Sequence, residues 1–325
     1  MFALPPLHPI HRPIHPLFSI PTIEERIAFI LTKWQQAGSP SALYWEHNSA
    51  ELMCLSIAED KLFLPGDEIY AGIETASPRE GSTIQAKQGF MVNPYPFKAK
   101  PVLYLAPTDD PSYYKEGQTE LESRSKQPSP LYREGSPLIE PPPRWSVHTG
   151  MHPLLIYKDK GQKDAFSYGC DICRESPSPE EESPQFFRII SDMAKAVQFI
   201  HARGQVHTDL SLENFLIVNR KEGGKGAQII DIYHLEPITP DLIQKDLTTL
   251  GITLLKFYRL HPYSFPRLEA LLSQLIPVDK EQISHSRLVY FEEEDWKGLF
   301  ENVSKKSSIT LDQFVNELDN LSISS

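Results

Sequence analysis

The sequence predicts an α+β protein with a sheet-rich first part and a helical second part. Between residues 42 and 106, short runs rich in β-branched and aromatic residues alternate with Gly, Pro, Asn or charged separators, which is typical of an antiparallel sheet. After residue 183, apolar side chains recur at helical spacing, most strongly in "DLTTLGITLLKFY" (246–258). We therefore expect two lobes, residues 21–168 and 169–325, with a hinge near 169–173.

A Pro/His-rich arm, residues 1–20, precedes the first lobe. Its histidines, His8, His11 and His15, are close enough in sequence to suggest a metal site. The prolines between them prevent the helix that would align the three rings, so we expect an extended arm. Apolar residues at helical spacing then predict an amphipathic helix from about residue 22 to Gly38.

Six segments of the first lobe are predicted as strands: "ALYW", "ELMCLSI", "KLFL", "EIYAGI", "STIQAKQGFMV" and "PVLYLA". Residues 107–145 are polar and Pro-rich and predict a long loop, with room for one helix in "SYYKEGQTELESRSKQ". The segment "PLLIYKDKGQKDAFSY" predicts a hairpin, because two apolar runs flank a Lys-Asp-Lys-Gly turn.

Helices dominate the second lobe. Ser183 and Pro184 are typical of an N-cap and first helical position, and that helix is expected to run to Arg203. Two short strands, "FLIV" and "AQII", follow, and further helices are expected over 241–259, 266–276, 293–303 and 310–321. Thr310 and Gln313 predict a capping box at the last of them.

Composition excludes several classes of protein. A formal net charge of -11 argues against a nucleic-acid binder, which normally presents a basic face. No run approaches the ~18 apolar residues of a membrane span, and the N-terminus lacks the pattern of a signal peptide. Three cysteines are too few for a secreted disulfide framework. We expect a soluble, cytoplasmic protein with no membrane or nucleic-acid partner. Export by a non-classical route, whose signal cannot be recognised in the sequence, stays open.

The segment "HTDLSLENF" (207–215) carries the chemistry. An acid, Asp209, and an amide, Asn214, lie five residues apart before a strand, and a second strand ends at Asp231. A hairpin of these strands can bring the three side chains together at one end. Asn and Asp oxygens suit Mg²⁺, and a neighbouring Asp can accept the proton of an attacking hydroxyl. The other interpretation is an ordinary turn between a helix and a strand.

Four ordered segments resemble the protein kinase catalytic domain. "HTDLSLENFLI" resembles the catalytic loop, "IIDIY" the strand with the metal-binding Asp, "DLTTLGITLLKFY" the helix supporting the loop, and "FIHARGQVH" the approach to it. The resemblance covers residues 184–260 and implies a two-lobed kinase-like fold, with ATP and Mg²⁺ as cofactors. It assigns Asp209 as catalytic base, Asn214 and Asp231 as Mg²⁺ ligands, His207 as a structural hydrogen-bonding residue, and Asp246 as the loop's brace.

The sequence also departs from that family. Thr208 replaces the Arg that pairs with a phosphorylated activation loop, and Ser211 replaces a Lys near the transferred phosphate. Only fourteen residues separate Asp231 from Asp246, too few for the usual activation segment and peptide platform. No G-x-G-x-x-G occurs, and "SPREGST" (77–83) is the nearest segment. Gly81 is its only glycine, and the lack of further glycines limits how closely the backbone can approach phosphates.

The phosphate-holding lysine has two possible placements. Lys87 in "TIQAK" resembles the lysine strand of the family, and it would bind the nucleotide. If "KPVLYLA" is that strand instead, Leu105 occupies the lysine position and Lys87 would serve from the neighbouring strand. Lys87 can equally be a solvated strand lysine. Its ion-pair partner would be Glu116, Glu120 or Glu122.

One further motif is "CDIC" (170–173). It stands alone, with no second pair and no thioredoxin-like context, so two ordinary cysteines are the preferred interpretation over a metal or redox site.

Three functions follow from the resemblance. The first is an ATP/Mg²⁺-dependent phosphotransferase that modifies a Ser/Thr hydroxyl of a protein. The second is a pseudokinase, the same fold used as a binding or scaffold module. The third is a small-molecule phosphotransferase, which the short segment after Asp231 favours because small acceptors need no peptide platform.

Overall fold

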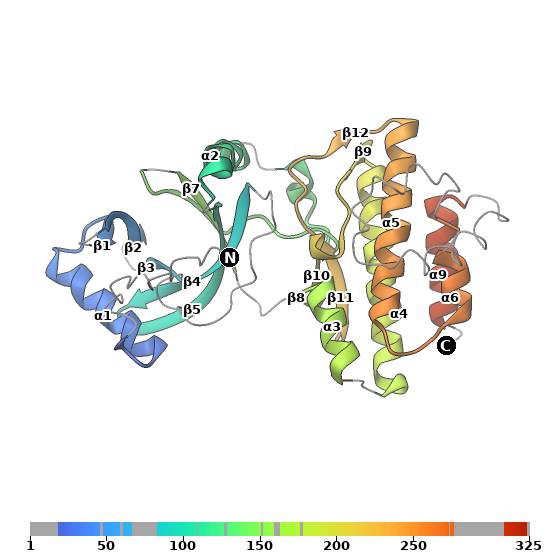
Figure 1. The fold of residues 1–325 in the computed structure, drawn as a ribbon, viewed down its shortest axis with the longest axis horizontal. Helices are drawn as coiled ribbons and strands as arrows, with labels where there is room; N and C mark the ends of the chain where they lie inside the picture. The colour runs from blue at the N-terminus through green and yellow to red at the C-terminus, as the bar shows by residue number, and fades with distance from the viewer. Residues whose placement is uncertain are drawn as a thin grey trace, which may run out of the picture. The chain divides into compact units, whose positions relative to one another are not determined.

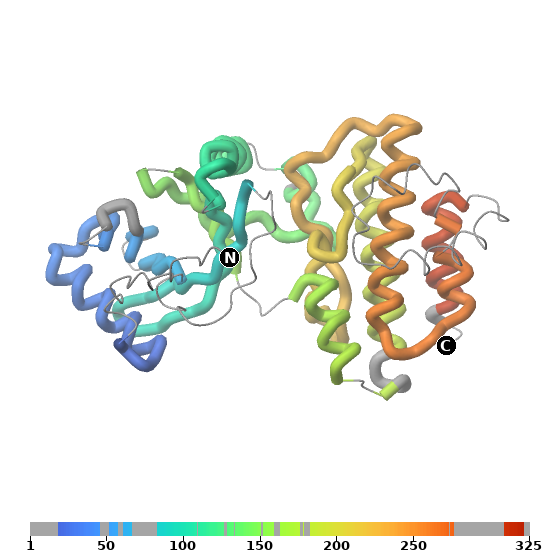
Figure 2. Tube along the Cα trace, in the orientation of Figure 1, coloured from blue at the N-terminus to red at the C-terminus, as the bar shows by residue number. Residues whose placement is uncertain are grey.

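The computed structural model of the chain describes residues 19–45, 48–58, 61–66, 83–108, 110–126, 129–150, 152–158, 163–175, 178–272, 274–275 and 309–323 (Figures 1 and 2). It is a mixed α+β protein that divides into two compact units. Unit 1 comprises Met1–Gln127 and Pro142–Lys160, and unit 2 comprises Pro128–Pro141 and Gly161–Ser325. No helix in the described part is long and apolar enough to cross a membrane.

Unit 1 is built on a curled antiparallel sheet. In the described residues its strand order is β1-β2-β3-β4-β5-β7-β6, and every neighbouring pair is antiparallel. The strands are β1 (Ala42–Trp45), β2 (Asn48–Ala58), β3 (Lys61–Pro65), β4 (Ile84–Pro94), β5 (Phe97–Pro107), β6 (Trp145–His148) and β7 (Pro153–Lys158). The expected strands within these ranges are confirmed, whereas "EIYAGI" (68–73) lies outside the described residues.

Two helices pack on one face of this sheet. Helix α1 (Ile23–Gln36) begins at a capping box between Thr22 and Glu25, and its apolar side contacts strand residues such as Leu64. Helix α2 (Pro111–Lys126) packs through Leu121 against Leu103 and Leu105 of β5. It confirms the single helix expected in the Pro-rich segment. The opposite face carries a second apolar cluster: Leu55, Phe63, Met91, Val102, Tyr104, Ala106, Leu154 and Ile156.

Unit 2 is mainly helical. In its described residues the α-helices are α3 (Ala165–Glu175), α4 (Pro179–His201), α5 (Pro240–Leu260), α6 (Pro266–Leu272) and α9 (Leu311–Ile323). Helix α4 packs against both α5 and α9, and its fully buried residues include Phe186, Ile190 and Met193. Thr310 and Gln313 form the expected capping box of α9. The helices expected at 241–259, 266–276 and 310–321 are therefore confirmed.

Two small sheets complete unit 2. One has the order β11-β10-β8, formed by β8 (Lys163–Asp164), β10 (Phe215–Asn219) and β11 (Lys225–Ile229). The other pairs β9 (Gln205–Val206) with β12 (Glu236–Pro237). Both sheets are antiparallel. Strands β10 and β11 belong to the segment 207–231, and β9 and β12 flank that segment in sequence.

Two expectations are corrected here. The hairpin expected in residues 153–168 is wrong, because β7 pairs with β5 and β6 while β8 pairs with β10. The second apolar run of that segment instead begins α3. Helix α4 begins at Pro179, after the N-cap Ser178, and not at Pro184, which lies inside it. Ser-Pro occurs at both places, so the local signal could not separate them.

The boundary between the units differs from the expected one. Residues 169–173, the expected hinge, lie within α3 of unit 2, and the chain enters unit 2 between Lys160 and Gly161. The segment Pro128–Pro141 also belongs to unit 2. The arm with His8, His11 and His15 and the helix expected at 293–303 lie outside the described residues.

Candidate catalytic loop

The loop that carries His207 and Asp209 starts where α4 ends. Gly204 has a positive φ of 70°, a conformation that glycine adopts without steric cost, and it turns the chain into β9. The loop then runs to η3 (Leu212–Asn214), a short 3-10 helix, and into β10. Asp209 is exposed, whereas His207, two residues before it, is buried. The carboxylate of Asp209 therefore faces solvent from a loop whose start is packed into the protein.

Asp246 of α5 holds the start of this loop. Its carboxylate accepts hydrogen bonds from the backbone N–H of His207 (2.8 Å) and of Thr208 (2.7 Å), and His201 Nε2 lies 2.9 Å from Oδ2. Asp246 is completely buried. A buried carboxylate is tolerated only when such donors surround it. The brace expected from the sequence is present.

Asn214 holds the middle of the loop. Its Nδ2 donates to the backbone oxygen of Asp209 at 2.7 Å and lies 3.4 Å from Asp209 Oδ2. With the amide nitrogen engaged in this way, the side-chain oxygen Oδ1 is the atom that Asn214 can offer to a cation. Thr253 Oγ1 of α5 also donates to the oxygen of Leu210 at 3.3 Å, so α5 supports the loop at a second point.

Asp231 follows directly from the strand beside Asn214. The N–H of Ile230 donates to the oxygen of Asn214 at 2.9 Å, and His207 Nε2 lies 3.0 Å from the oxygen of Ile230. These contacts bring Asp209, Asn214 and Asp231 to one end of the β10–β11 hairpin, as the sequence predicted. His207 is the bridge between the loop and the strand that delivers Asp231.

Two backbone conformations at the site are sparsely populated. Thr208 has φ of 64° and Asp231 has φ of 59°, both in the left-handed region. For residues other than glycine this conformation costs on the order of 1 kcal/mol or more and concentrates at functional sites. Asp246 bonds to the N–H of Thr208, which holds the first of these two residues in place.

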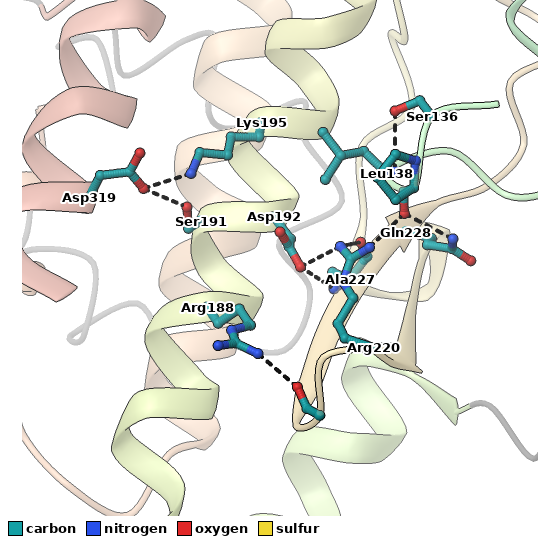
Figure 3. A network of polar contacts seen from close by, with 12 residues as sticks. Ser136, Leu138, Arg188, Ser191, Asp192, Lys195, Arg220, Ala227, Gln228 and Asp319 are labelled. Atoms are coloured by element: carbon teal, nitrogen blue, oxygen red, sulfur yellow. Dashed lines mark hydrogen bonds and ion pairs between the residues drawn. The ribbon is translucent and has the colours of Figure 1, made fainter. Parts of the chain in front are cut away.

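A buried ion pair fixes the register of β10 and β11. Arg220, in the turn between the strands, donates to Asp192 Oδ2 of α4 and, at 2.9 Å, to the oxygen of Pro137 (Figure 3). The same Asp192 oxygen accepts the N–H of Ala227 at 3.1 Å. A slip of one residue along β11 would displace Asp231 by about 3.3 Å and turn its side chain to the other face. The Asp192–Arg220 pair therefore contributes to the position of Asp231.

The segment Pro128–Pro141 braces β11 from its other edge. Ile139 forms a parallel bridge with Ile229, the N–H of Ile229 donates to Leu138, and the N–H of Glu140 donates to Ile229. It contains η2 (Pro130–Glu134), whose Tyr132 ring makes an edge-to-face contact with Tyr233, two residues beyond Asp231. Both sides of the strand that leads to Asp231 are thus covered by backbone partners.

The chain returns quickly after Asp231. Glu236 pairs with Val206 in the β9–β12 sheet, and the N–H of Ile238 donates to Gly204. Helix α5 starts at Pro240, capped by Thr239. Between Asp231 and Asp246 the chain forms only β12 and the first turns of α5.

The donors at this end fit Mg²⁺. Asn214 offers an amide oxygen and Asp231 a carboxylate, both hard ligands that Mg²⁺ combines with waters and phosphate oxygens. Among the described residues, no cluster of three or more His, Cys, Asp and Glu side chains is placed to hold a metal ion. The residues present therefore suit a cation that brings its own waters or phosphates, not an all-protein cage.

Lys87 lies in unit 1, on β4. Its register partner is Tyr104, and paired residues of antiparallel strands point to the same face. That is the face opposite to the one covered by α2. Lys87 contributes to lowering the pKa of His152, for which burial is the first cause and His148 the second.

The candidate glutamates of α2 have other contacts. Glu120 accepts from Arg124 and from Thr83 Oγ1 at 2.5 Å, and Glu122 pairs with Lys126 at 3.1 Å. Glu116 is exposed. Strand β5 directly precedes α2. This order matches the alternative in which "KPVLYLA" is the strand compared with the lysine strand of the family, so that Leu105 stands at the position of the lysine.

Sequence reasoning missed three residues of the site. His201 was read only as part of the helix end, and Asp192 and Arg220 were not singled out. A lone acid on the apolar side of α4 was the available signal for Asp192, since it lies between the buried residues Met193 and Ser191.

A scan against protein-family models and a search of curated proteins find no match to this chain.

Proposed function

We propose that the chain is a protein-kinase-like phosphotransferase that transfers the γ-phosphate of ATP, with Mg²⁺, to a Ser/Thr hydroxyl of a protein. The observation that carries this proposal is the set of contacts around Asp246. One buried carboxylate of α5 bonds the loop before Asp209, while Asn214 and His207 tie that loop to the strand of Asp231. An ordinary turn needs none of these long-range contacts.

The arrangement of unit 1 supports the same proposal. A curled antiparallel sheet with α2 inserted between β5 and β6, followed by a helical unit, is what a two-lobed kinase-like fold requires. Strand β5, which precedes α2, pairs directly with β7, the last strand of the unit in sequence.

Asp209 is the residue proposed to act on the acceptor. Its carboxylate is exposed and lies beside Asn214, so an incoming hydroxyl can donate to it. Orientation of that hydroxyl, with removal of its proton as it attacks phosphorus, is the expected role. Asn214 keeps Asp209 oriented through the hydrogen bond from its Nδ2 to the Asp209 backbone oxygen.

The cation, when bound, would neutralise charge on the phosphates. Asn214 and Asp231 would hold it through oxygen atoms, with waters and phosphate oxygens as the other ligands. Ser211, at the position where the family places a lysine, adds no positive charge there. We therefore expect a low transfer rate.

A pseudokinase is the second candidate, and one observation favours it. Leu105 packs against Leu121 of α2 in the apolar cluster where the family's lysine–glutamate pair would stand. A small-molecule phosphotransferase is the third candidate, and the short return of the chain after Asp231 is the observation that favours it.

Nucleotide binding distinguishes these candidates from an unrelated function. Thermal unfolding of the wild type should shift to higher temperature with ATP and Mg²⁺ together, because a ligand of the native state stabilises it. Asp231→Ala should remove the Mg²⁺-dependent part of the shift, and Asp241→Ala, an exposed acid of α5, should retain it. An equal Mg²⁺-dependent shift in both variants would refute the assignment of Asp231.

A further inference from the structure

We propose that Cys170 and Cys173 form a vicinal dithiol that exchanges with small-molecule disulfides of the glutathione type and closes to an intrahelical disulfide. Both cysteines lie on α3, three residues apart, and neither forms a disulfide. This site is independent of the proposed phosphate transfer. It replaces the interpretation of the CxxC motif as two ordinary cysteines.

The helix places the two residues within reach of each other. From the rise and turn of an α-helix, Cα atoms three residues apart are about 5 Å from each other, inside the disulfide range of about 4.4–6.8 Å. Their Cβ atoms lie about 5–6 Å apart and a disulfide needs about 3.5–4.5 Å. Closure therefore requires an approach of about 1–2 Å, which the helix must supply by a local change.

The position of the pair in α3 allows that change. Cys173 is two residues from the end of the helix at Glu175, in the turn whose carbonyl groups lack intrahelical partners. The first turn is fixed separately, since Asp164 accepts from the N–H and the hydroxyl of Ser167, each at 2.8 Å. Gly169 packs directly on Leu260, where an added Cβ would come within 2.6 Å of Cδ1. The last turn can thus rearrange while the first remains anchored.

Exposure assigns different roles to the two thiols. Cys173 is exposed, so it is the thiol that meets an incoming disulfide. Cys170 is partly buried, and burial is the main cause that raises its pKa, with Arg174 opposing the shift. A thiol with a raised pKa is a poor first nucleophile, but its neighbour's mixed disulfide is within its reach. Cys170 is therefore the resolving thiol.

The reaction balances in two steps. The Cys173 thiolate attacks one sulfur of the small disulfide, forming a mixed disulfide and releasing one small thiol. Cys170 then attacks the Cys173 sulfur, forming the Cys170–Cys173 bond and releasing the second small thiol. The protein loses two protons and two electrons, which is a loss of two hydrogen atoms in mass, and the small disulfide is reduced to two thiols.

Helix α3 contacts η3, the short helix that ends at Asn214, and Ala165 and Tyr168 of its anchored first turn pack in the same core as Leu212. The rearrangement that closes the disulfide is confined to the last turn, so the dithiol site acts independently of the catalytic loop.

Cys54 provides an internal control. It is completely buried in unit 1, and burial raises its pKa to about 12. A thiol of that kind is inert in the native protein. Any reaction at Cys54 during the assay would report unfolding.

The test uses the native full chain with oxidised glutathione, acid quenching and intact-mass measurement, followed by peptide mapping. The wild type should lose two hydrogens in a Cys170–Cys173 bond, and Cys170→Ser should stop at one glutathione adduct on Cys173. Cys173→Ser should react at least ~10-fold more slowly. A stable adduct on the wild type, equal rates for the two variants, or reaction of Cys54 at a similar rate would overturn the proposal.

Discussion

The Asp246 carboxylate accepts the backbone N–H of His207 at 2.8 Å, which ties a buried helix to the loop of Asp209 across 39 residues of sequence. Asp246→Asn replaces one acceptor oxygen by an NH₂ group that faces backbone donors. Each buried donor left without a partner costs about 1–3 kcal/mol. We expect the free energy of unfolding to fall by about 2–4 kcal/mol.

Urea unfolding measures this change, with Asp241→Asn as the control. Asp241 is exposed in the first turn of the same helix, and its replacement should cost less than about 1 kcal/mol. Equal, small effects for both variants would show that Asp246 does not brace the loop.

The Asp192–Arg220 pair should be energetically coupled. Both side chains are mostly buried, at 15% and 10% exposure, and Arg220 also bonds to Pro137. A double-mutant cycle with Asp192→Ala and Arg220→Ala should give a coupling energy of about 1–3 kcal/mol. The more exposed pair Arg259–Glu269 should give less than about 1 kcal/mol in the same cycle. Equal coupling in both pairs would argue against a register-fixing role.

Gly117 tests the close packing of α2. A Cβ at this position would lie 2.0 Å from the oxygen of Thr83 and 3.2 Å from Pro107 Cα, both backbone atoms that cannot simply rotate away. Alanine favours an exposed helix interior by about 1 kcal/mol over glycine, so stabilisation is expected from propensity alone. We expect Gly117→Ala to destabilise unit 1 by about 1–3 kcal/mol instead. Thr119→Ala, at an exposed position of α2, is the control, and thermal unfolding of both variants is the measurement.

His261 should make the stability of unit 2 depend on pH. Its ring stacks 4.0 Å from Phe186, Nδ1 accepts the N–H of Tyr263, and burial lowers its pKa below the usual 6.5. Among the described residues, its Nε2 has no hydrogen-bond partner. The unfolded chain therefore binds a proton at a higher pH than the folded chain does. The stabilisation is complete above about pH 6.5 and is lost as the pH falls below that value.

The comparison is between the wild type and His261→Phe, which keeps an aromatic ring in the cluster. Unfolding free energies measured from pH 7.5 to 5 should fall more steeply for the wild type. His234→Gln, at an exposed position, should follow the wild type. Parallel curves for the wild type and His261→Phe would contradict this account.

The sequence predicted elements that carry local signals. The capping box at Thr310 and the apolar spacing of α1 and α5 place three helices within a few residues of their observed ends. The loop that holds Asn214 against Asp209 was predicted as well, because only five residues separate the two side chains in sequence. Local patterns determine local geometry, and these elements need nothing more.

The predictions that failed concern contacts between segments that are distant in sequence. Strand β8 was expected beside β7, but its partner is Leu216 on β10, far along the chain. The contact of Asp192 with Arg220 spans 28 residues, and that of His201 with Asp246 spans 45. Such contacts depend on how helices and hairpins pack, which no short segment encodes.

Phosphate transfer with labelled ATP and Mg²⁺ tests the central claim most directly. Wild type and Asp209→Asn should be assayed side by side, for transfer to a generic protein acceptor and to the chain itself, after equal folding is established. Loss of the proton acceptor should lower the rate by at least about tenfold while nucleotide affinity changes little, because Asp209 is not a proposed metal ligand. The account predicts measurable transfer by the wild type that falls in Asp209→Asn. Equal transfer by both proteins, or none by a wild type that still binds ATP, would contradict it.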